Sequence, residues 1–139
     1  MAHDHPMPTD LTRNQELVLG ALTGTTGPLS AYDILDKLRG DGLRAPLQVY
    51  RALDKLVERG FAHRLESINA FVACADSHCH RRSGLIAFAI CDNCGRVDEF
   101  ADEVIDERLG AWAEAKGFKV ERTTMEIRGR CADCLNQAA

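Results

Sequence analysis

Two C-x-x-C steps decide how the second half of this sequence folds: Cys91-Asp92-Asn93-Cys94 and Cys131-Ala132-Asp133-Cys134. Each step lets two thiolates reach one ion from a single tight turn. Two such steps complete the tetrahedral shell of four cysteines that is typical of structural zinc. Residues 95–130 lie between the steps, a longer interval than a compact zinc ribbon has. We therefore expect one zinc ion to tie together the two ends of a folded segment, as a zinc knot.

The alternative to a metal is a pair of disulfides or a redox dithiol. Residues 1–9 are polar and match neither a secretory signal nor a transit peptide. No run approaches the roughly 18 consecutive apolar residues that a membrane span needs. At 139 residues, 45% of them hydrophobic, the chain can form one ordinary domain or two small ones. We expect a cytoplasmic protein with no membrane partner, whose thiols stay reduced and available to metal.

The formal net charge of −4 at first argues against a nucleic-acid partner, but the charge is unevenly distributed. Residues 39–64 hold six basic and three acidic side chains, whereas residues 65–139 hold nine basic and thirteen acidic ones. Local charge, rather than the total, sets the attraction to phosphates. An ordinary solvated surface is the alternative for residues 39–64, and their charge alone does not decide between the two.

The first half predicts three helices followed by a hairpin. Two helix starts carry capping-box pairs, Thr12 with Gln15 and Ser30 with Asp33. A third helix begins near Pro46 and ends at Gly60, and alternating runs over 61–66 and 70–74 predict the hairpin. Periodicity alone gives a small helical domain. With the hairpin, the pattern favours a winged helix-turn-helix whose recognition helix, residues 47–59, enters a DNA major groove.

Residues 75–84 are polar and irregular and are predicted to form a hinge. The remainder predicts strands at 85–90, 96–100 and 118–128, with a helix at 103–116 whose Ile105, Leu109 and Trp112 point inward. The expected fold is α+β: a winged helix-turn-helix domain over residues 1–74 and a small α/β domain over residues 85–139, with one helix on a three-stranded sheet clamped by the four-cysteine zinc knot.

A second group of metal-capable residues surrounds the hinge: His63, Cys74, His78, Cys79, His80 and Glu99. Antiparallel pairing of the hairpin is expected to bring His63 and Cys74 together. Imidazole, thiolate and carboxylate ligands taken from both halves of the chain would form an exchangeable site. The alternative is that His63 is a half-buried wing residue and Cys74 a small hydrophobic one.

Several stretches give the chain a family resemblance: residues 30–35 (Ser-Ala-Tyr-Asp-Ile-Leu), 49–53 (Val-Tyr-Arg-Ala-Leu), 60–63 (Gly-Phe-Ala-His), 91–97 and 131–134. Together they resemble the ferric uptake regulator (Fur) family, most closely its zinc uptake regulator (Zur) branch, over residues 11–135. The resemblance implies a homodimer that binds double-stranded DNA at an inverted repeat, with the C-terminal α/β domains pairing the two subunits.

The resemblance also implies roles for individual residues. The structural zinc ligands are Cys91, Cys94, Cys131 and Cys134; three regulatory ligands are His63, Cys74 and Glu99; and the DNA-contacting side chains are Tyr32, Tyr50 and Arg51. The family usually has a His seven residues before the first knuckle cysteine, and this chain has Gly84 there. We take His80 as the fourth regulatory ligand, with His78 and Cys79 as alternatives. Lys55 lies off the buried stripe of the recognition helix and is expected near phosphate.

The sequence thus predicts a zinc-responsive transcriptional repressor, not an enzyme, with two zinc ions per subunit and no small-molecule substrate. The resemblance implies zinc uptake genes as its targets. A sensor of iron, manganese or peroxide on the same fold is one alternative. The other is a C-x-x-C thiol oxidoreductase, which usually needs a thioredoxin-like setting that the sequence does not show.

Overall fold

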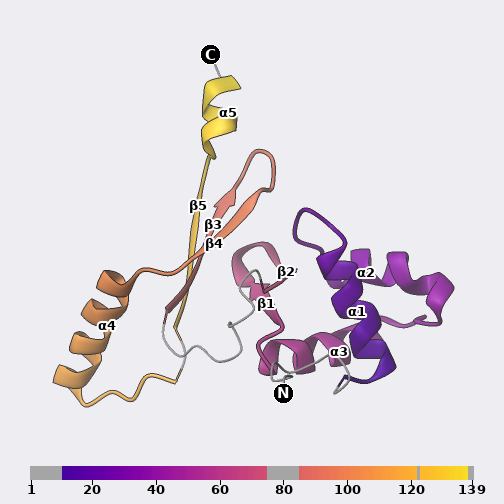
Figure 1. Cartoon of the computed structure of the whole chain (residues 1–139), viewed down its shortest axis with the longest axis horizontal. Coiled ribbons are helices and arrows are strands. Elements are labelled where there is room, and N and C mark those ends of the chain that lie inside the picture. Colours follow the sequence, from indigo (N-terminus) through magenta and orange to yellow (C-terminus); the bar gives the residue numbers. More distant parts are fainter. Residues whose placement is uncertain (1–10, 75–84, 122, 138–139) are drawn as a thin grey trace, which may run out of the picture. The chain divides into compact units, whose positions relative to one another are not determined.

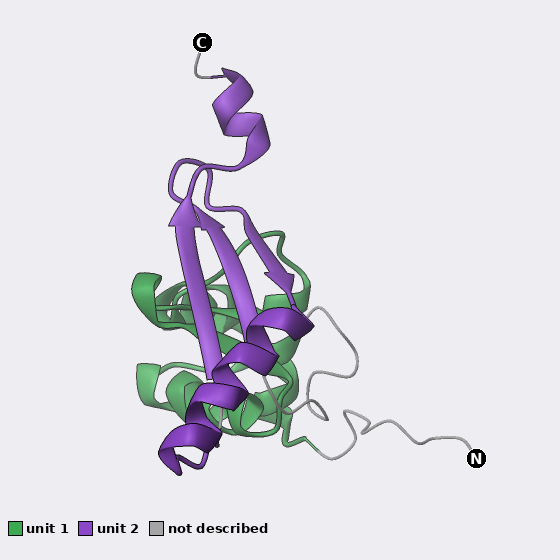
Figure 2. Ribbon diagram, turned by 90° about the vertical axis from the view of Figure 1, so that its left-hand side faces the viewer, with its two compact units in different colours: residues 1–80 green, residues 81–139 purple. Residues whose placement is uncertain are grey.

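The computed structural model describes residues 11–74, 85–121 and 123–137, and it divides into two compact units, Met1–His80 and Arg81–Ala139 (Figure 2). The division falls inside residues 75–84. Those residues lie outside the described ranges, so the hinge and the domain limits drawn from the sequence remain predictions. Figure 1 gives the order of the helices and strands.

Three helices form most of unit 1: α1 (Arg13–Thr23), α2 (Ala31–Leu38) and α3 (Pro46–Glu58). Both predicted capping boxes are present. The side chain of Thr12 accepts from the Gln15 N–H at 3.2 Å, and that of Ser30 accepts from the Asp33 N–H at 3.1 Å. These bonds satisfy backbone donors that a helix start would otherwise leave unpaired. A short 3-10 turn (Arg39–Asp41) follows α2, and Gly42 at φ 104° redirects the chain toward α3.

The core of unit 1 lies where the three helices meet. Each of the three helices contributes fully buried side chains to it, among them Val18, Ile34 and Leu53. On α3 the buried positions are spaced at three and four residues, so one stripe of the helix faces the core and the other side is exposed.

The predicted hairpin is also present. Strand β1 (Ala62–Leu65) pairs antiparallel with β2 (Ala70–Ala73), and the 3-10 turn Glu66–Ile68 joins them. Asn69 closes this turn at φ 51°, a left-handed conformation that Asn tolerates better than most residues. Leu29 and Phe71 exchange two backbone hydrogen bonds, of 3.0 and 2.8 Å, which fasten the hairpin beside the start of α2. Unit 1 is therefore a winged helix-turn-helix.

Unit 2 consists of β3 (Leu85–Cys91), β4 (Val97–Phe100), α4 (Glu103–Lys116), β5 (Thr123–Gly129) and α5 (Ala132–Gln137). The sheet order is β4-β3-β5, with β3 antiparallel to β4 and parallel to β5. Phe88, at the centre of β3, is fully buried. The predicted three-stranded sheet is confirmed, while α5 is an element that the sequence pattern did not predict.

The last strand starts later than the sequence predicts, because the end of α4 uses the residues before it. Gly117 adopts φ 67°, and the Phe118 N–H donates to the Ala113 carbonyl at 2.8 Å, which is a Schellman helix ending. The ring of Phe118 then packs on Trp112, with 5.9 Å between the ring centroids. Phe118 therefore belongs to the helix cap, and β5 begins at Thr123.

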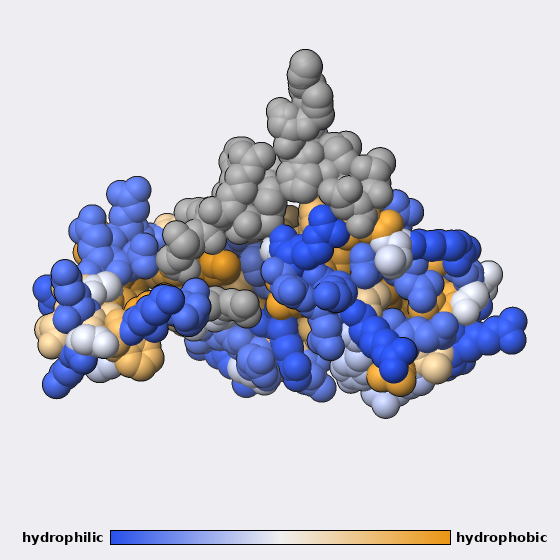
Figure 3. All heavy atoms as spheres, turned by 90° about the horizontal axis from the view of Figure 1, so that it is seen from below, coloured by the Kyte–Doolittle hydropathy of each residue, from blue (hydrophilic) through white to orange (hydrophobic). Residues whose placement is uncertain are grey.

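The sequence predicts that one face of α4 points inward, with Ile105, Leu109 and Trp112 on it. In the single chain this prediction is wrong. Ile105 is half-buried, whereas Leu109 and Trp112 remain 38% and 55% exposed, and Ala113 is the buried residue of α4. Apolar patches are visible among polar side chains around α4 in Figure 3. Helical periodicity identifies an apolar face, but it does not say whether the same chain or another one covers it.

No helix within the described residues is both long enough and apolar enough to span a membrane.

Candidate metal centres and DNA-binding surface

The ends of two strands bring the four paired cysteines together. Strand β3 ends at Cys91, and the chain then makes a tight turn in which the Gly95 N–H donates to the Cys91 carbonyl at 2.9 Å. Gly95 has φ 81°, a conformation that a side chain would strain. Strand β5, parallel to β3, ends beside it at Gly129, just before Cys131. Helix α5 then supplies Cys134.

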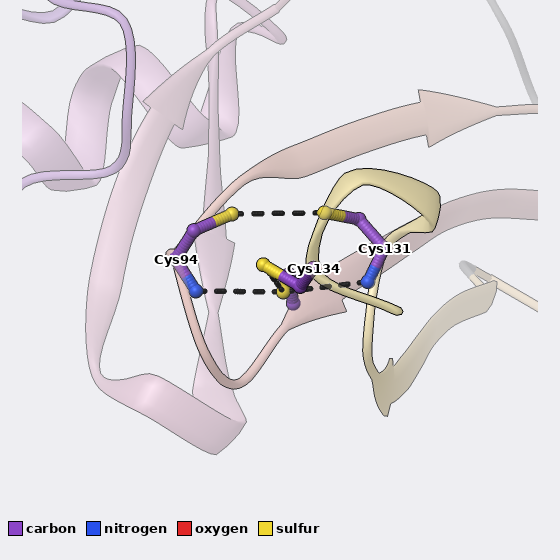
Figure 4. Close-up of side chains that lie close together, drawn as sticks. Cys94, Cys131 and Cys134 are labelled. Atoms are coloured by element: carbon purple, nitrogen blue, oxygen red, sulfur yellow. Dashed lines mark hydrogen bonds between the residues drawn. The ribbon is translucent and has the colours of Figure 1, made fainter. Parts of the chain in front are cut away.

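The four sulfur atoms have the spacing of a tetrahedral zinc site. The Sγ atoms of Cys91 and Cys134 are 3.7 Å apart, those of Cys94 and Cys131 are 3.8 Å apart, and all four lie within 4.8 Å of one another (Figure 4). A Zn–S length of about 2.3 Å gives a tetrahedron with S–S edges of about 3.8 Å. All four cysteines are free thiols. The donor set and its spacing therefore fit a structural zinc ion.

Hydrogen bonds to two of the sulfur atoms stabilise negative charge in part of this site. The backbone N–H groups of Cys94 and Cys131 each donate to the Cys91 sulfur at 3.4 Å, and they lower the pKa of Cys91 to about 6. The Asn93 side chain donates to the Cys134 sulfur at 3.2 Å. The knot therefore favours a thiolate at Cys91 even before a metal binds.

Two of the other thiols hold their protons more tightly. The Asn93 amide lowers the pKa of Cys134, but burial and the neighbouring thiols outweigh it and raise the pKa to about 11. The backbone N–H of Arg96 lowers the pKa of Cys94. The neighbouring Cys91 thiol and partial loss of hydration have the opposite effect, and the net result is a raised pKa. Four thiolates this close would repel one another. A divalent cation removes the repulsion and releases the protons when it binds.

Ion pairs around the knot hold its parts in register. Arg128, in β5, contacts the Asp92 carboxylate of the first knuckle at 2.8 Å. Arg96 pairs with Asp98 at 3.2 Å and with Asp133 of the second knuckle at 3.7 Å. Sequence reasoning did not find these pairs or the Asn93 bond. The only signal for them is the presence of opposite charges beside the two C-x-x-C steps.

The hairpin brings His63 and Cys74 together, as expected. His63 is opposite Val72 in the strand register, and the Cys74 N–H donates to the Phe61 carbonyl at 3.0 Å, so Cys74 is a diagonal neighbour of His63 on the same face. Their potential ligand atoms lie within 4.8 Å of each other, and both residues are half-buried. Cys74 is disulfide-bonded in the structure, so it can bind a metal as a thiolate only after reduction.

The other predicted regulatory ligands are in different parts of the chain. Glu99 lies in β4, opposite Phe88 of β3, and is half-buried. His78, Cys79 and His80 lie outside the described residues. The role of each of these residues therefore stays a prediction.

Two of the predicted DNA contacts, Arg51 and Lys55, lie on the side of α3 that faces away from the core. Arg51 is exposed and makes no ion pair within the described ranges, whereas Lys55 pairs with Glu58 at 3.4 Å. Tyr50 is half-buried and packs against the core of unit 1. Tyr32, at the start of α2, is 61% exposed. An exposed aromatic ring and an exposed guanidinium on the two helices of a helix-turn-helix suit contact with DNA.

A winged helix-turn-helix followed by an α/β unit with a four-cysteine knot defines a class of metal-binding DNA-binding proteins. The model of the ferric uptake regulator family matches residues 9–128, and the chain belongs to this family. Among its relatives are the zinc uptake regulation proteins of Escherichia coli K12 and Shigella flexneri. Each is 39% identical to it over 132 residues, a match that covers 93% of this chain and 75% of the relative.

Solved structures give the same result. The chain is similar to holo XcZur, with a TM-score of 0.80 and 40% identity over 91% of this chain and 86% of that one. It is also similar to a zinc uptake regulator in complex with zinc and DNA, with a TM-score of 0.84 and 37% identity over 92% and 85% of the two chains.

The knot predicts a clear effect of Cys91→Ser. This variant should lose the tightly bound zinc of the knot and unfold at lower denaturant concentration, because the remaining three sulfurs cannot close the shell. Zinc content by native mass spectrometry and urea unfolding followed by circular dichroism would measure both effects. Cys74→Ser is the matched control and should keep this zinc. A Cys91→Ser protein that keeps wild-type zinc content and stability would contradict the assignment.

Proposed function

We propose that this protein is a zinc-responsive transcriptional repressor of zinc uptake genes, acting in the cytoplasm as a zinc-loaded homodimer on an inverted-repeat operator. The observation that carries the proposal is the similarity, over 92% of the chain, to a zinc uptake regulator solved with zinc and DNA. The exposed face of α3 and the spacing of the four knot cysteines in this chain support it. The protein is a regulator and not an enzyme.

Two zinc ions per subunit have different tasks in this proposal. The first occupies the four-cysteine knot and holds the ends of the sheet in unit 2 together. The second is the regulatory ion and binds His63, Cys74, Glu99 and His80. Support for it comes from the adjacent imidazole and sulfur of the wing. Its ligands come from both units, so this ion constrains the angle between them when it binds.

Zinc regulates DNA binding in this scheme through differential affinity. A zinc ion can favour the DNA-competent arrangement only to the extent that it binds that arrangement more tightly than the others. By linkage, operator DNA must raise the affinity for the regulatory zinc by the same factor. The knot zinc has no such role, because its ligands all belong to unit 2 and it is retained whether or not DNA is bound.

The ligand chemistry favours zinc over iron or manganese. A thiolate at Cys74 suits zinc, whereas manganese and iron sites lean toward oxygen and imidazole. A thiol oxidoreductase would need a reactive cysteine at a helix start. Cys91, the knot thiol whose pKa is lowered to about 6, lies instead at the end of β3 and 3.7 Å from Cys134, in a zinc-like shell.

The exposed apolar residues of unit 2 support a homodimer. Val104, Leu109 and Trp112 on α4, and Phe118 after it, leave apolar surface in solvent that a single chain does not cover. Homodimer interfaces are more apolar than the remaining surface and are enriched in aromatic residues. We propose that the partner subunit covers this surface.

A zinc titration tests the proposed function. An inverted-repeat duplex selected from a random pool is labelled, and its affinity for the reduced protein is measured across buffered zinc concentrations by fluorescence anisotropy. Affinity should rise steeply as the second zinc per subunit binds, and it should not rise with iron or manganese. Equal DNA affinity at all zinc concentrations would contradict a zinc-responsive repressor.

Arg51 is expected to read a base. Arg51→Ala should weaken operator binding by about 1–3 kcal/mol, and the loss should be confined to the specific sequence. Competition between operator and random DNA in the same salt would measure this. Lys55→Ala is the comparison, because the loss of a phosphate contact should weaken both DNAs alike. An equal loss on both DNAs for Arg51→Ala would make Arg51 a phosphate contact too.

Cys74→Ser should keep the dimer and the knot zinc but lose zinc-dependent DNA binding, because the knot does not use Cys74. His80→Ala should have the same effect, and His78→Ala should be near neutral. Zinc content and operator affinity, measured together in reductant, separate the two sites. A full zinc response in His80→Ala, with a loss in His78→Ala or Cys79→Ser, would assign the fourth ligand to one of those residues instead.

A further inference from the structure

Leu47 is an apolar side chain on the polar side of the recognition helix. It is 56% exposed, whereas Val49, Leu53 and Leu56 of the same helix are fully buried. The buried stripe of α3 starts at Val49, so Leu47 is not part of it. Among the described residues of unit 1, Tyr32 and Leu47 are the large apolar side chains that remain exposed, and each lies in the first turn of a helix of the helix-turn-helix.

Leu47 also lies where a recognition helix approaches base edges. It follows Pro46, the first residue of α3, and the N-terminal residues of such a helix contact bases in the major groove. Arg51, four residues later, is exposed on the same face. The first turn of α3 contains no acidic residue, so no carboxylate repels DNA phosphates there.

The neighbouring polar side chain is already engaged. The Gln48 side-chain oxygen accepts hydrogen bonds from the backbone N–H groups of Arg44 at 2.8 Å and Ala45 at 3.1 Å. A glutamine that reads adenine needs both its oxygen and its nitrogen for the base. If Gln48 turned toward a base, the two N–H groups would lose their acceptor at the helix start. Gln48 is therefore a cap, which leaves Leu47 and Arg51 as the exposed side chains of the first two turns that can face the bases.

We infer that Leu47 is a specificity-determining residue that packs against the 5-methyl group of a thymine in each half-site of the operator. The thymine methyl is the apolar feature that the major groove presents, and apolar side chains recognise it by contact. Leu47 then selects thymine over cytosine at one position, next to the base read by Arg51. This inference rests on the proposed function, because it requires a specific DNA operator.

A thymine scan tests the assignment with the zinc-loaded full-length protein. Each thymine of the selected operator is replaced in turn by deoxyuridine, which removes only the methyl group. One position per half-site should weaken wild-type binding about fourfold, the factor that corresponds to burying one methyl group. Leu47→Ala should weaken binding to the thymine operator by a similar factor and should be insensitive to deoxyuridine at that position. Leu47→Met, which keeps an apolar side chain, should retain the sensitivity.

Two controls keep the result interpretable. Leu47→Ala should keep wild-type circular dichroism and zinc content, because the side chain is exposed and Ala favours a helix. Leu135→Ala removes a leucine of similar exposure, 58%, from α5 and should keep the full sensitivity to deoxyuridine. The assignment is overturned if no thymine is sensitive in the wild type, or if Leu47→Ala keeps the sensitivity. Failure of the zinc-loaded wild type to bind any selected duplex would contradict the proposed function instead.

Discussion

The closure of the four-cysteine knot is the constraint on which unit 2 depends. Strand β3 leads into the first C-x-x-C step and β5 into the second, so a single ion bound at the knot would fix the parallel pairing of two strands that are distant in sequence. The sheet has three strands and one fully buried aromatic residue, Phe88, which is a small core for an independent unit. A metal ion bound at the knot would add binding free energy to this small core.

Unit 1 is stabilised differently. Its three helices bury a continuous apolar core, and its wing is held by the hydrogen bonds between Leu29 and Phe71 and needs no metal in order to pair. A metal ion bound at His63 and Cys74, as proposed above, could therefore be exchanged without unfolding unit 1. The two proposed metal sites therefore differ in how far the local fold would depend on the ion: unit 2 would depend on the knot ion, whereas unit 1 folds around its own apolar core.

The sequence predicted the features that have local chemical signatures. Thr12 with Gln15, Ser30 with Asp33, and the four paired cysteines each follow from residue type and spacing, and each has the expected geometry. Features that depend on packing were predicted less well. Helical periodicity places the apolar face of α4 in the interior of the chain, where the structure does not, and the Schellman ending at Gly117 makes the last strand shorter than predicted. Periodicity places Gln48 off the buried face, but its capping bonds depend on the path of residues 44 and 45, which periodicity does not give.

The uncovered face of α4 also ties the stability of unit 2 to the number of protein molecules in a cell. If a second subunit covers Trp112 and Phe118, as proposed above, mass action governs that part of the folding free energy. Dilution therefore weakens the unit without any change in its own contacts. Such a regulator would lose stability as its copy number falls. The dimer, which would present two recognition helices to DNA, would then be the more stable form.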